Sequence, residues 1–180
     1  MRKTIAIWAW TLLVIFAAQG RAQSTSNYCC EGYAFFGRRT STPGTNVGGV
    51  GGDIFIYKGL ALGGDVGTTV GNPDNKITIG SGDVSYHFAS RNPRFKVEPF
   101  IAAGWSYLAG QIKTAIEYPF NPGNDRTGPN ISAGSAFWPT KRVGARFEFR
   151  VYKFPVSYGA LENVIPGGDF VEFRIAFTVR

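Results

Sequence analysis

Charged side chains recur at every second position in parts of this chain. Residues 142–151 place Arg146, Glu148 and Arg150 on one face of an extended segment and put Phe147 and Phe149 on the other. Such alternation is typical of a β-strand, because successive side chains point to opposite sides. The charged face meets water if the sheet is soluble, whereas a closed transmembrane barrel would turn the apolar face to lipid and enclose the charges.

The same pattern in other segments assembles a larger set of charges. If these faces point inward, the sequence predicts an ionic network in the lumen. Its members are Asp65, Asp83, Lys96, Glu98, Arg146, Glu148, Arg150, Glu172 and Arg174. An eight-stranded barrel is just wide enough to be filled by its own side chains, so five acids against four bases predict a structural plug. The alternative is a switchable ion pathway in which Arg146 or Arg150 exchanges carboxylate partners.

Catalytic and metal-binding residues are scarce. His87 is the only histidine, and Ser85 and Asp83 precede it on the same predicted face. At about 3.3 Å per strand residue, Ser85 lies about 6.6 Å and Asp83 about 13 Å from it along the backbone, which predicts no direct contact. We therefore predict a polar lining histidine, no enzyme activity, no metal site and no cofactor.

Cys29 and Cys30 are neighbours in the sequence. Adjacent Cα atoms lie about 3.8 Å apart, below the usual disulfide range of about 4.4–6.8 Å, so a bond between them would be strained. Two free thiols are the prediction, with a bridge between two chains as the alternative.

The N-terminus predicts export. Two basic residues precede an apolar run at 5–18, and small residues at 20 and 22 suit cleavage by a signal peptidase. We assign 1–22 to a signal peptide and 23–180 to one mature domain; an uncleaved anchor is the alternative, although a spanning helix needs about 20 apolar residues. Cleavage leaves 16 Lys and Arg against 12 Asp and Glu. This modest excess does not favour a nucleic-acid partner.

Eight strands are predicted in the mature domain. Their ranges are 31–38, 47–57, 60–70, 76–88, 95–108, 130–137, 142–151 and 169–179. Lys58-Gly59 is a hairpin signal, and residues 110–129 read as a long loop. The apolar positions change parity at Gly80–Gly82, which predicts a β-bulge.

Short connections follow the second, fourth and sixth strands, and longer ones follow the odd-numbered strands. This asymmetry is typical of outer-membrane barrels, which have short periplasmic turns and longer extracellular loops. The predicted fold is all-β: an eight-stranded antiparallel transmembrane β-barrel, an up-and-down meander preceded by a signal peptide. Aromatic residues near the strand ends are predicted to be lipid-facing anchors: Trp105, Tyr107, Phe137, Trp138 and Tyr152.

Segments 48–67, 83–88, 98–105 and 143–152 together resemble the eight-stranded outer-membrane β-barrel family that includes the OmpA transmembrane domain and OmpX. The resemblance implies a Gram-negative cell envelope, location in the outer membrane, and folding by the barrel-assembly machinery. Members usually end on an aromatic residue, whereas this sequence ends at Arg180. Because it stops at the eighth strand, the peptidoglycan-binding domain of OmpA, and thus cell-wall tethering, is not carried over.

These observations predict a small, monomeric outer-membrane protein with a closed polar lumen and a structural or surface-interaction role. Its expected partners are outer-membrane lipids and lipopolysaccharide, whose phosphates Arg38 and Arg39 could pair with from the first outward loop. The main alternative is a soluble secreted or periplasmic lipocalin-like barrel that carries a small apolar ligand. A narrow channel or a membrane-embedded lipid enzyme is a further alternative, for which no residue set is evident.

Overall fold

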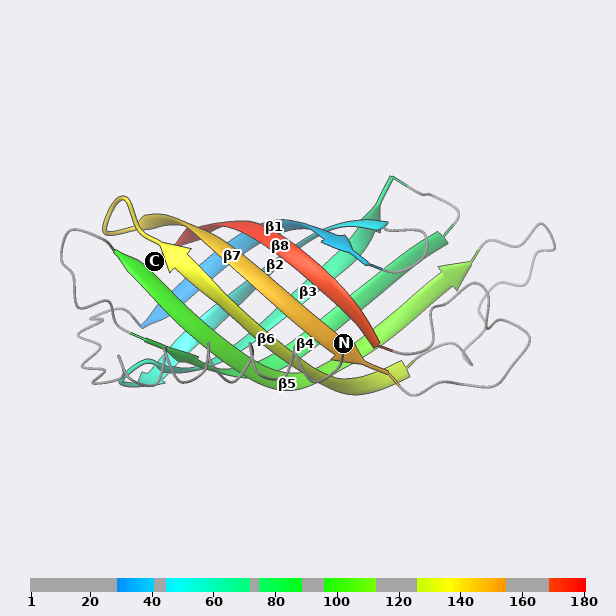
Figure 1. Cartoon of the computed structure of the whole chain (residues 1–180), viewed down its shortest axis with the longest axis horizontal. Helices are drawn as coiled ribbons and strands as arrows, with labels where there is room; N and C mark the ends of the chain where they lie inside the picture. Colours follow the sequence, from blue (N-terminus) through cyan, green and yellow to red (C-terminus); the bar gives the residue numbers. More distant parts are fainter. Residues whose placement is uncertain (1–28, 41–44, 72–74, 89–95, 113–125, 155–168) are drawn as a thin grey trace, which may run out of the picture.

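A computed structural model describes residues 29–40, 45–71, 75–88, 96–112, 126–154 and 169–180, which form one closed β-barrel. Each strand pairs antiparallel with its neighbours in the sequence, and the last strand closes on the first (Figure 1). The strands are β1 (Cys30–Arg39), β2 (Thr45–Tyr57), β3 (Leu60–Val70), β4 (Asn75–His87), β5 (Val97–Ile112), β6 (Arg126–Phe137), β7 (Val143–Lys153) and β8 (Asp169–Val179). The proposed signal peptide at 1–22 lies outside the described residues. Among those described, no helix is long and apolar enough to span a membrane.

The predicted loop at 110–129 is too long at both ends. β5 continues to Ile112 and β6 already begins at Arg126, so the strand passes through Gly128 and Pro129. A Cβ atom added to Gly128 would lie 2.0 Å from the carbonyl oxygen of Lys153. This glycine therefore permits the close approach of a neighbouring strand, and its presence does not signal a turn.

The predicted β-bulge at Gly80–Gly82 is wrong. The pairing of β4 with β3 and with β5 runs without a shift, whereas the register of β2 with β3 shifts between Phe55 and Tyr57. Ile79 consequently points into the barrel, where it is buried, whereas Val84 points outward. The parity of apolar residues changes along β4 because the apolar side chains line the interior at one end of the strand and the exterior at the other.

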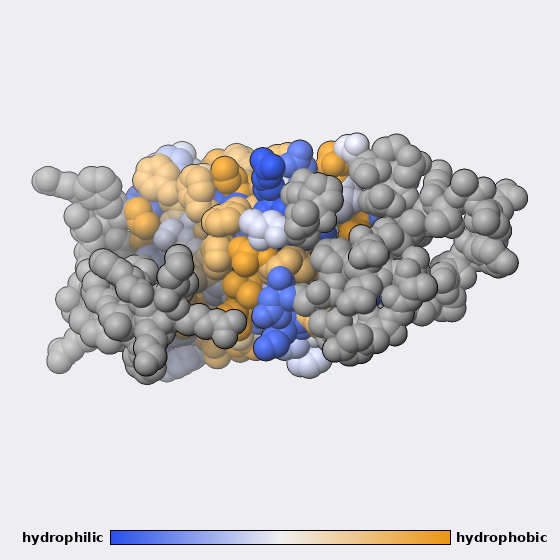
Figure 2. Space-filling view, turned by 45° about the vertical axis from the view of Figure 1, so that its right-hand side comes forward, coloured by the Kyte–Doolittle hydropathy of each residue, from blue (hydrophilic) through white to orange (hydrophobic). Residues whose placement is uncertain are grey.

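Buried and exposed side chains alternate along the strands. The outward positions carry large apolar side chains such as Ile54, Ile131, Phe147 and Ile175, all more than half exposed. Figure 2 shows apolar residues gathered in a broad band over the wall of the barrel. The inward positions carry most of the polar and charged residues of the strands. The buried side chains of the strands therefore lie in the lumen of the barrel.

The connections define two ends of the barrel. We call the end with connections 58–59, 88–96 and 138–142 the turn end; the start of β1 and the end of β8 lie there as well. The loop end has the connections 40–44, 71–74, 113–125 and 154–168. The predicted alternation of short and long connections is therefore only partial, since the loop-end connections 40–44 and 71–74 are shorter than the turn-end connection 88–96.

An apolar cluster occupies the lumen at the loop end. Its buried members are Ile79, Leu108, Tyr152, Phe154 and Phe170, and Ile77 packs against them. The rings of Tyr152 and Phe170 stack with centroids 4.8 Å apart. Since these residues come from β4, β5, β7 and β8 and from the residue after β7, the cluster joins different parts of the wall across the lumen.

Candidate functional site: an ionic network in the lumen

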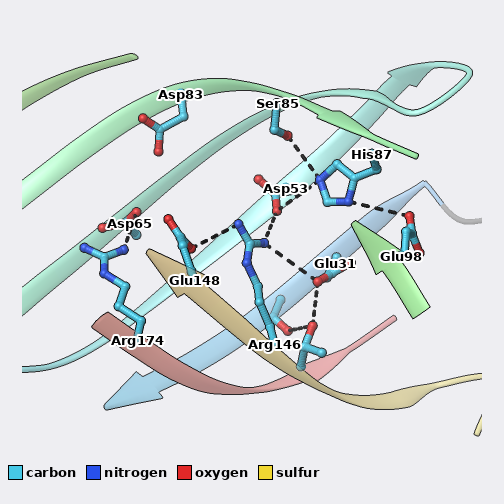
Figure 3. Close-up of polar contacts among 12 residues, drawn as sticks. Glu31, Asp53, Asp65, Asp83, Ser85, His87, Glu98, Arg146, Glu148 and Arg174 are labelled. Carbon is cyan, nitrogen blue, oxygen red and sulfur yellow. Dashed lines mark hydrogen bonds and ion pairs between the residues drawn. The ribbon is translucent and has the colours of Figure 1, made fainter. Parts of the chain in front are cut away.

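Charged side chains from seven strands meet inside the barrel, from the apolar cluster to the turn end. They project toward one another from different parts of the wall (Figure 3). The fully or largely buried members are Glu31, Arg39, Asp53, Asp65, Asp83, Glu98, Arg146, Glu148, Arg150, Glu172 and Arg174. Unpaired charges in such a place would be costly, so the partners of each group decide what the site can do.

Arg150 of β7 pairs with three carboxylates. Its guanidinium lies 2.9 Å from Asp65 Oδ2, 2.9 Å from Asp83 Oδ2 and 2.8 Å from Glu148 Oε1. Only 1% of its side chain is exposed. Because Asp65 belongs to β3 and Asp83 to β4, this one side chain ties β7 to two strands on another part of the wall.

Arg146 makes the equivalent links nearer the turn end. Its Nη1 donates to Asp53 Oδ2 of β2 at 2.6 Å, and its Nη2 lies 3.3 Å from Glu148 Oε2. Glu31 of β1 lies 3.8 Å away. The guanidinium also lies over the ring of Phe100, 4.0 Å from its centroid, which adds a cation–π contact with β5.

Arg174 and Arg39 extend the network toward the loop end. Arg174 Nε donates to Glu172 Oε1 at 2.6 Å, its Nη1 lies 3.1 Å from Asp65 Oδ2, and its Nη2 donates to the hydroxyl of Tyr152. Glu172 also accepts from Arg39 Nε at 3.0 Å, across the seam between β8 and β1. The network thus reaches the apolar cluster through Tyr152.

Arg180 closes the network at the turn end. Its guanidinium pairs with Glu98 and lies 3.2 Å from Glu31 Oε2, and it sits 3.8 Å from the centroid of a Trp138 ring. Trp138 is buried, so the lumen has an aromatic residue at this end too. A continuous series of ion pairs therefore runs along the barrel from Arg39 to Glu98. Arg126 makes no ion pair with any of the described residues.

His87 belongs to the turn-end part of the network, and the predicted absence of contact with Ser85 is wrong. Ser85 Oγ lies 3.2 Å from His87 Nε2, while Nδ1 lies 3.5 Å from Glu98 Oε1 (Figure 3). The estimate from backbone spacing failed because the imidazole ring itself covers much of the distance. The three groups have the connectivity of a hydrolytic triad. Ser85 is only 2% exposed, however, and His87 is fully buried, so a substrate cannot reach the hydroxyl in this closed form.

Eight of the nine predicted network residues lie in this site, and Lys96 does not. Lys96 is exposed just before β5 begins, because its strand position is too close to the turn end to be enclosed. Glu31, Asp53 and Arg180 belong to the network but were missed. The alternation around Glu31 and Asp53 could have found them, since both occupy the inward parity of β1 and β2.

The other predicted surface residues divide between the two sides of the wall. Trp105, Tyr107 and Phe137 are exposed on the outside, whereas Trp138 and Tyr152, predicted to face lipid, point into the lumen. Arg38 is exposed, but its neighbour Arg39 is buried and bound to Glu172, so Arg39 cannot contact lipopolysaccharide. Adjacent residues of a strand face opposite sides, which explains each of these divisions.

The cysteines and metal-binding residues add no further centre. Cys29 and Cys30 are exposed free thiols with their Sγ atoms 3.0 Å apart at the turn end. Within the described ranges, no group of three or more His, Cys, Asp or Glu side chains is placed to hold a metal ion.

Removing the Arg150 guanidinium should destabilise the barrel strongly. Arg150→Met keeps much of the side-chain length but leaves Asp65, Asp83 and Glu148 without this partner, and breaking a buried charge network of this kind costs about 3–5 kcal/mol. The measurement is the free energy of urea unfolding in detergent micelles or lipid vesicles. Arg38→Met, on the outer surface, is the matched control and should change stability little. Equal stability of wild type and Arg150→Met would contradict the assigned role.

Solved structures that align with this chain include eight-stranded outer-membrane barrels. The N-terminal β-barrel domain of Pseudomonas aeruginosa OprF aligns with a TM-score of 0.59 and 18% identity over 83% of this chain and 96% of that domain. Neisserial surface protein A aligns with a TM-score of 0.61 and 15% identity over 83% of this chain and 94% of the other. Ail of Yersinia pestis, solved in complex with the heparin analogue sucrose octasulfate, gives a TM-score of 0.57 and 9% identity over 83% and 95%.

No protein-family model matches the chain, and no curated protein matches its sequence. At the identities found among solved structures, the likeness concerns the fold. The chain has the fold of the eight-stranded outer-membrane β-barrels that these structures represent.

Proposed function

We propose that this protein is a small outer-membrane barrel with a structural or surface-interaction role, and that its lumen is a closed ionic plug. The observation that carries the proposal is the division of the wall into two faces. Large apolar side chains cover the outside, as lipid contact requires, while the charges inside pair with one another across the lumen. Export by a cleaved signal peptide, folding by the barrel-assembly machinery and a monomeric state belong to the same proposal.

The arrangement of side chains disfavours the soluble alternative. A lipocalin-like carrier of an apolar ligand needs an apolar cavity inside its barrel. Here the middle of the lumen holds Asp65, Arg146 and Arg150, and the apolar rows of β7 and β8 point outward. Such a wall, placed in water, would expose a far larger apolar surface than monomeric soluble proteins normally do.

The packing also favours a plug over an ion pathway. Arg146 and Arg150 each contact carboxylates on more than one strand, so an exchange of partners would have to break several short contacts at once. The apolar cluster at the loop end adds a second barrier, because an ion there would lose its hydration without gaining polar ligands.

Three measurements test the proposal, one on cells and two on the purified protein. Cell fractionation should place the protein in the outer membrane, and the extracted barrel should migrate faster on a gel before boiling than after it. In planar bilayers, wild type and Arg146→Met should both give negligible current, because the apolar cluster remains in the variant. Recovery in the soluble periplasmic fraction would refute membrane insertion, and a steady current through Arg146→Met would refute the plug.

Lipopolysaccharide is the proposed surface partner at the loop end, through Arg38. Its side chain is exposed on the outside of β1, and in the register it faces Asn46 of β2 and Phe173 of β8. A guanidinium at this position could donate two hydrogen bonds to one phosphate group.

Arg38→Gln should lower the amount of lipopolysaccharide that copurifies with the barrel severalfold. Lys153→Gln is the matched control, since Lys153 lies in register with the exposed Asp169 and already has an acidic neighbour. The amount bound can be measured by phosphate analysis of the purified complex. An unchanged amount in Arg38→Gln would remove lipopolysaccharide from the proposal.

A further inference from the structure

The exposed charged side chains at the turn end are all positive within the part of the chain that the structure describes. Lys58 lies in the β2–β3 turn, Lys96 precedes β5, and Lys141 and Arg142 lie in the β6–β7 turn. All four are exposed, and none has a carboxylate within ion-pair distance among the described residues. The turn end therefore presents four cations from three separate connections, which we call the basic rim.

The acids of this end are already bound inside the barrel. Glu31 accepts from Thr178 and lies beside Arg146 and Arg180, and Glu98 pairs with Arg180. The ionic network thus withdraws the carboxylates that could have neutralised the rim. Among the described residues no acidic side chain pairs with these cations, so an external anion can bind them.

The two ends of the barrel also differ in the charges of their connecting sequences. The three turn-end connections contain Lys and Arg but no Asp or Glu. The four loop-end connections contain Asp74, Glu117, Asp125 and Glu162 with Lys113 as their only basic residue. A general excess of basic residues would raise the positive charge at both ends, so this asymmetry is specific to the turn end.

Exposed apolar side chains adjoin the cations of the rim. The Lys58 ammonium lies 5.2 Å from the ring centroid of Tyr57, which is itself 64% exposed. Lys96 is brought beside the end of β6 by a hydrogen bond from Trp138 N to its carbonyl oxygen, next to the exposed Phe137. Arg142 directly precedes the exposed Val143. Aromatic and aliphatic groups beside basic side chains are typical of the boundary between hydrocarbon and headgroups.

We propose that the basic rim binds the phosphate groups of anionic glycerophospholipids in the leaflet at the turn end. Lys and Arg side chains at this depth can reach phosphates while their aliphatic stems remain beside the apolar wall. A soluble polyanion would not explain why Lys58, Lys96 and Arg142 each adjoin an exposed apolar residue. The rim is separate from the lumen network and from Arg38, which lies at the opposite end of β1 from the turn end.

The experiment compares lipid binding by the full chain and two variants in bilayers of phosphatidylcholine with a minor fraction of phosphatidylglycerol. The turn-end variant combines Lys58→Gln, Lys96→Gln, Lys141→Gln and Arg142→Gln. The loop-end control combines Lys76→Gln and Lys153→Gln, two exposed cations that lie outside the rim and have no assigned binding role. Lipids that remain bound are identified by native mass spectrometry after release from the bilayer.

Wild type and the loop-end control should retain phosphatidylglycerol in preference to phosphatidylcholine, and salt should weaken this preference. The turn-end variant should lose at least about tenfold in the preference, since each cation near an anionic surface contributes on the order of a factor of five. An unchanged preference in the turn-end variant, or an equal loss in both variants, would overturn the proposal. So would binding to isolated peptidoglycan that needs the four cations, without any phospholipid preference.

The proposal rests on insertion into a membrane, which is part of the proposed function. Gel migration before and after boiling, measured on the same samples, separates the two. A heat-modifiable, inserted barrel with no phospholipid preference overturns the lipid site alone. Failure of wild type to insert would overturn the proposed function together with the lipid site.

Discussion

The need to pair buried charge across a narrow lumen is the constraint on which the rest of this structure depends. Arg146 and Arg150 lie on the same face of β7, with Glu148 between them. Together they pair with carboxylates of β1, β2, β3, β4 and β7. Each guanidinium has several donors in a rigid plane, so one arginine can join strands that share no backbone ladder. The ladders close the wall, and the arginines hold opposite parts of that wall together.

This constraint also orders the outside and the two ends of the barrel. Because the inward parity of β7 and β8 is used by charges, the outward parity is free to carry Phe147, Phe149, Ile175 and other lipid-compatible side chains. The apolar cluster lies in the lumen at the loop end, and Arg180 packs on the ring of Trp138 at the turn end. Because the acidic side chains of the turn end form ion pairs inside the lumen, the exposed charged side chains at this end are basic. The paired charges in the lumen, the apolar outer wall and the basic rim are thus consequences of one distribution of charge.

Alternation predicted the strands best where both faces differ in kind. β7 and β8 follow the expected ranges closely because charge on one face and Phe or Ile on the other leave no doubt about parity. Ile79 could not be placed in this way, since an apolar residue fits the lumen near a closed end as well as it fits lipid. Lys96 and Arg39 show a second limit. A shift of one residue along a strand moves a side chain from the lumen to the outside of the barrel. The position at which a strand enters the barrel wall depends on its neighbouring strands, which the alternation of one segment does not reveal. The contact of Ser85 with His87 depends on side-chain direction, which spacing along the backbone does not contain.

A double-mutant cycle between Asp53 and Arg146 tests the central claim most directly. These residues join β2 to β7 through a 2.6 Å contact across the lumen. Unfolding free energies of wild type, Asp53→Asn, Arg146→Met and the double variant give the coupling between them. A plug that binds the walls together predicts a favourable coupling of about 1–3 kcal/mol. Effects that add to within about 0.5 kcal/mol would show that the two charges do not stabilise each other, and would contradict the account.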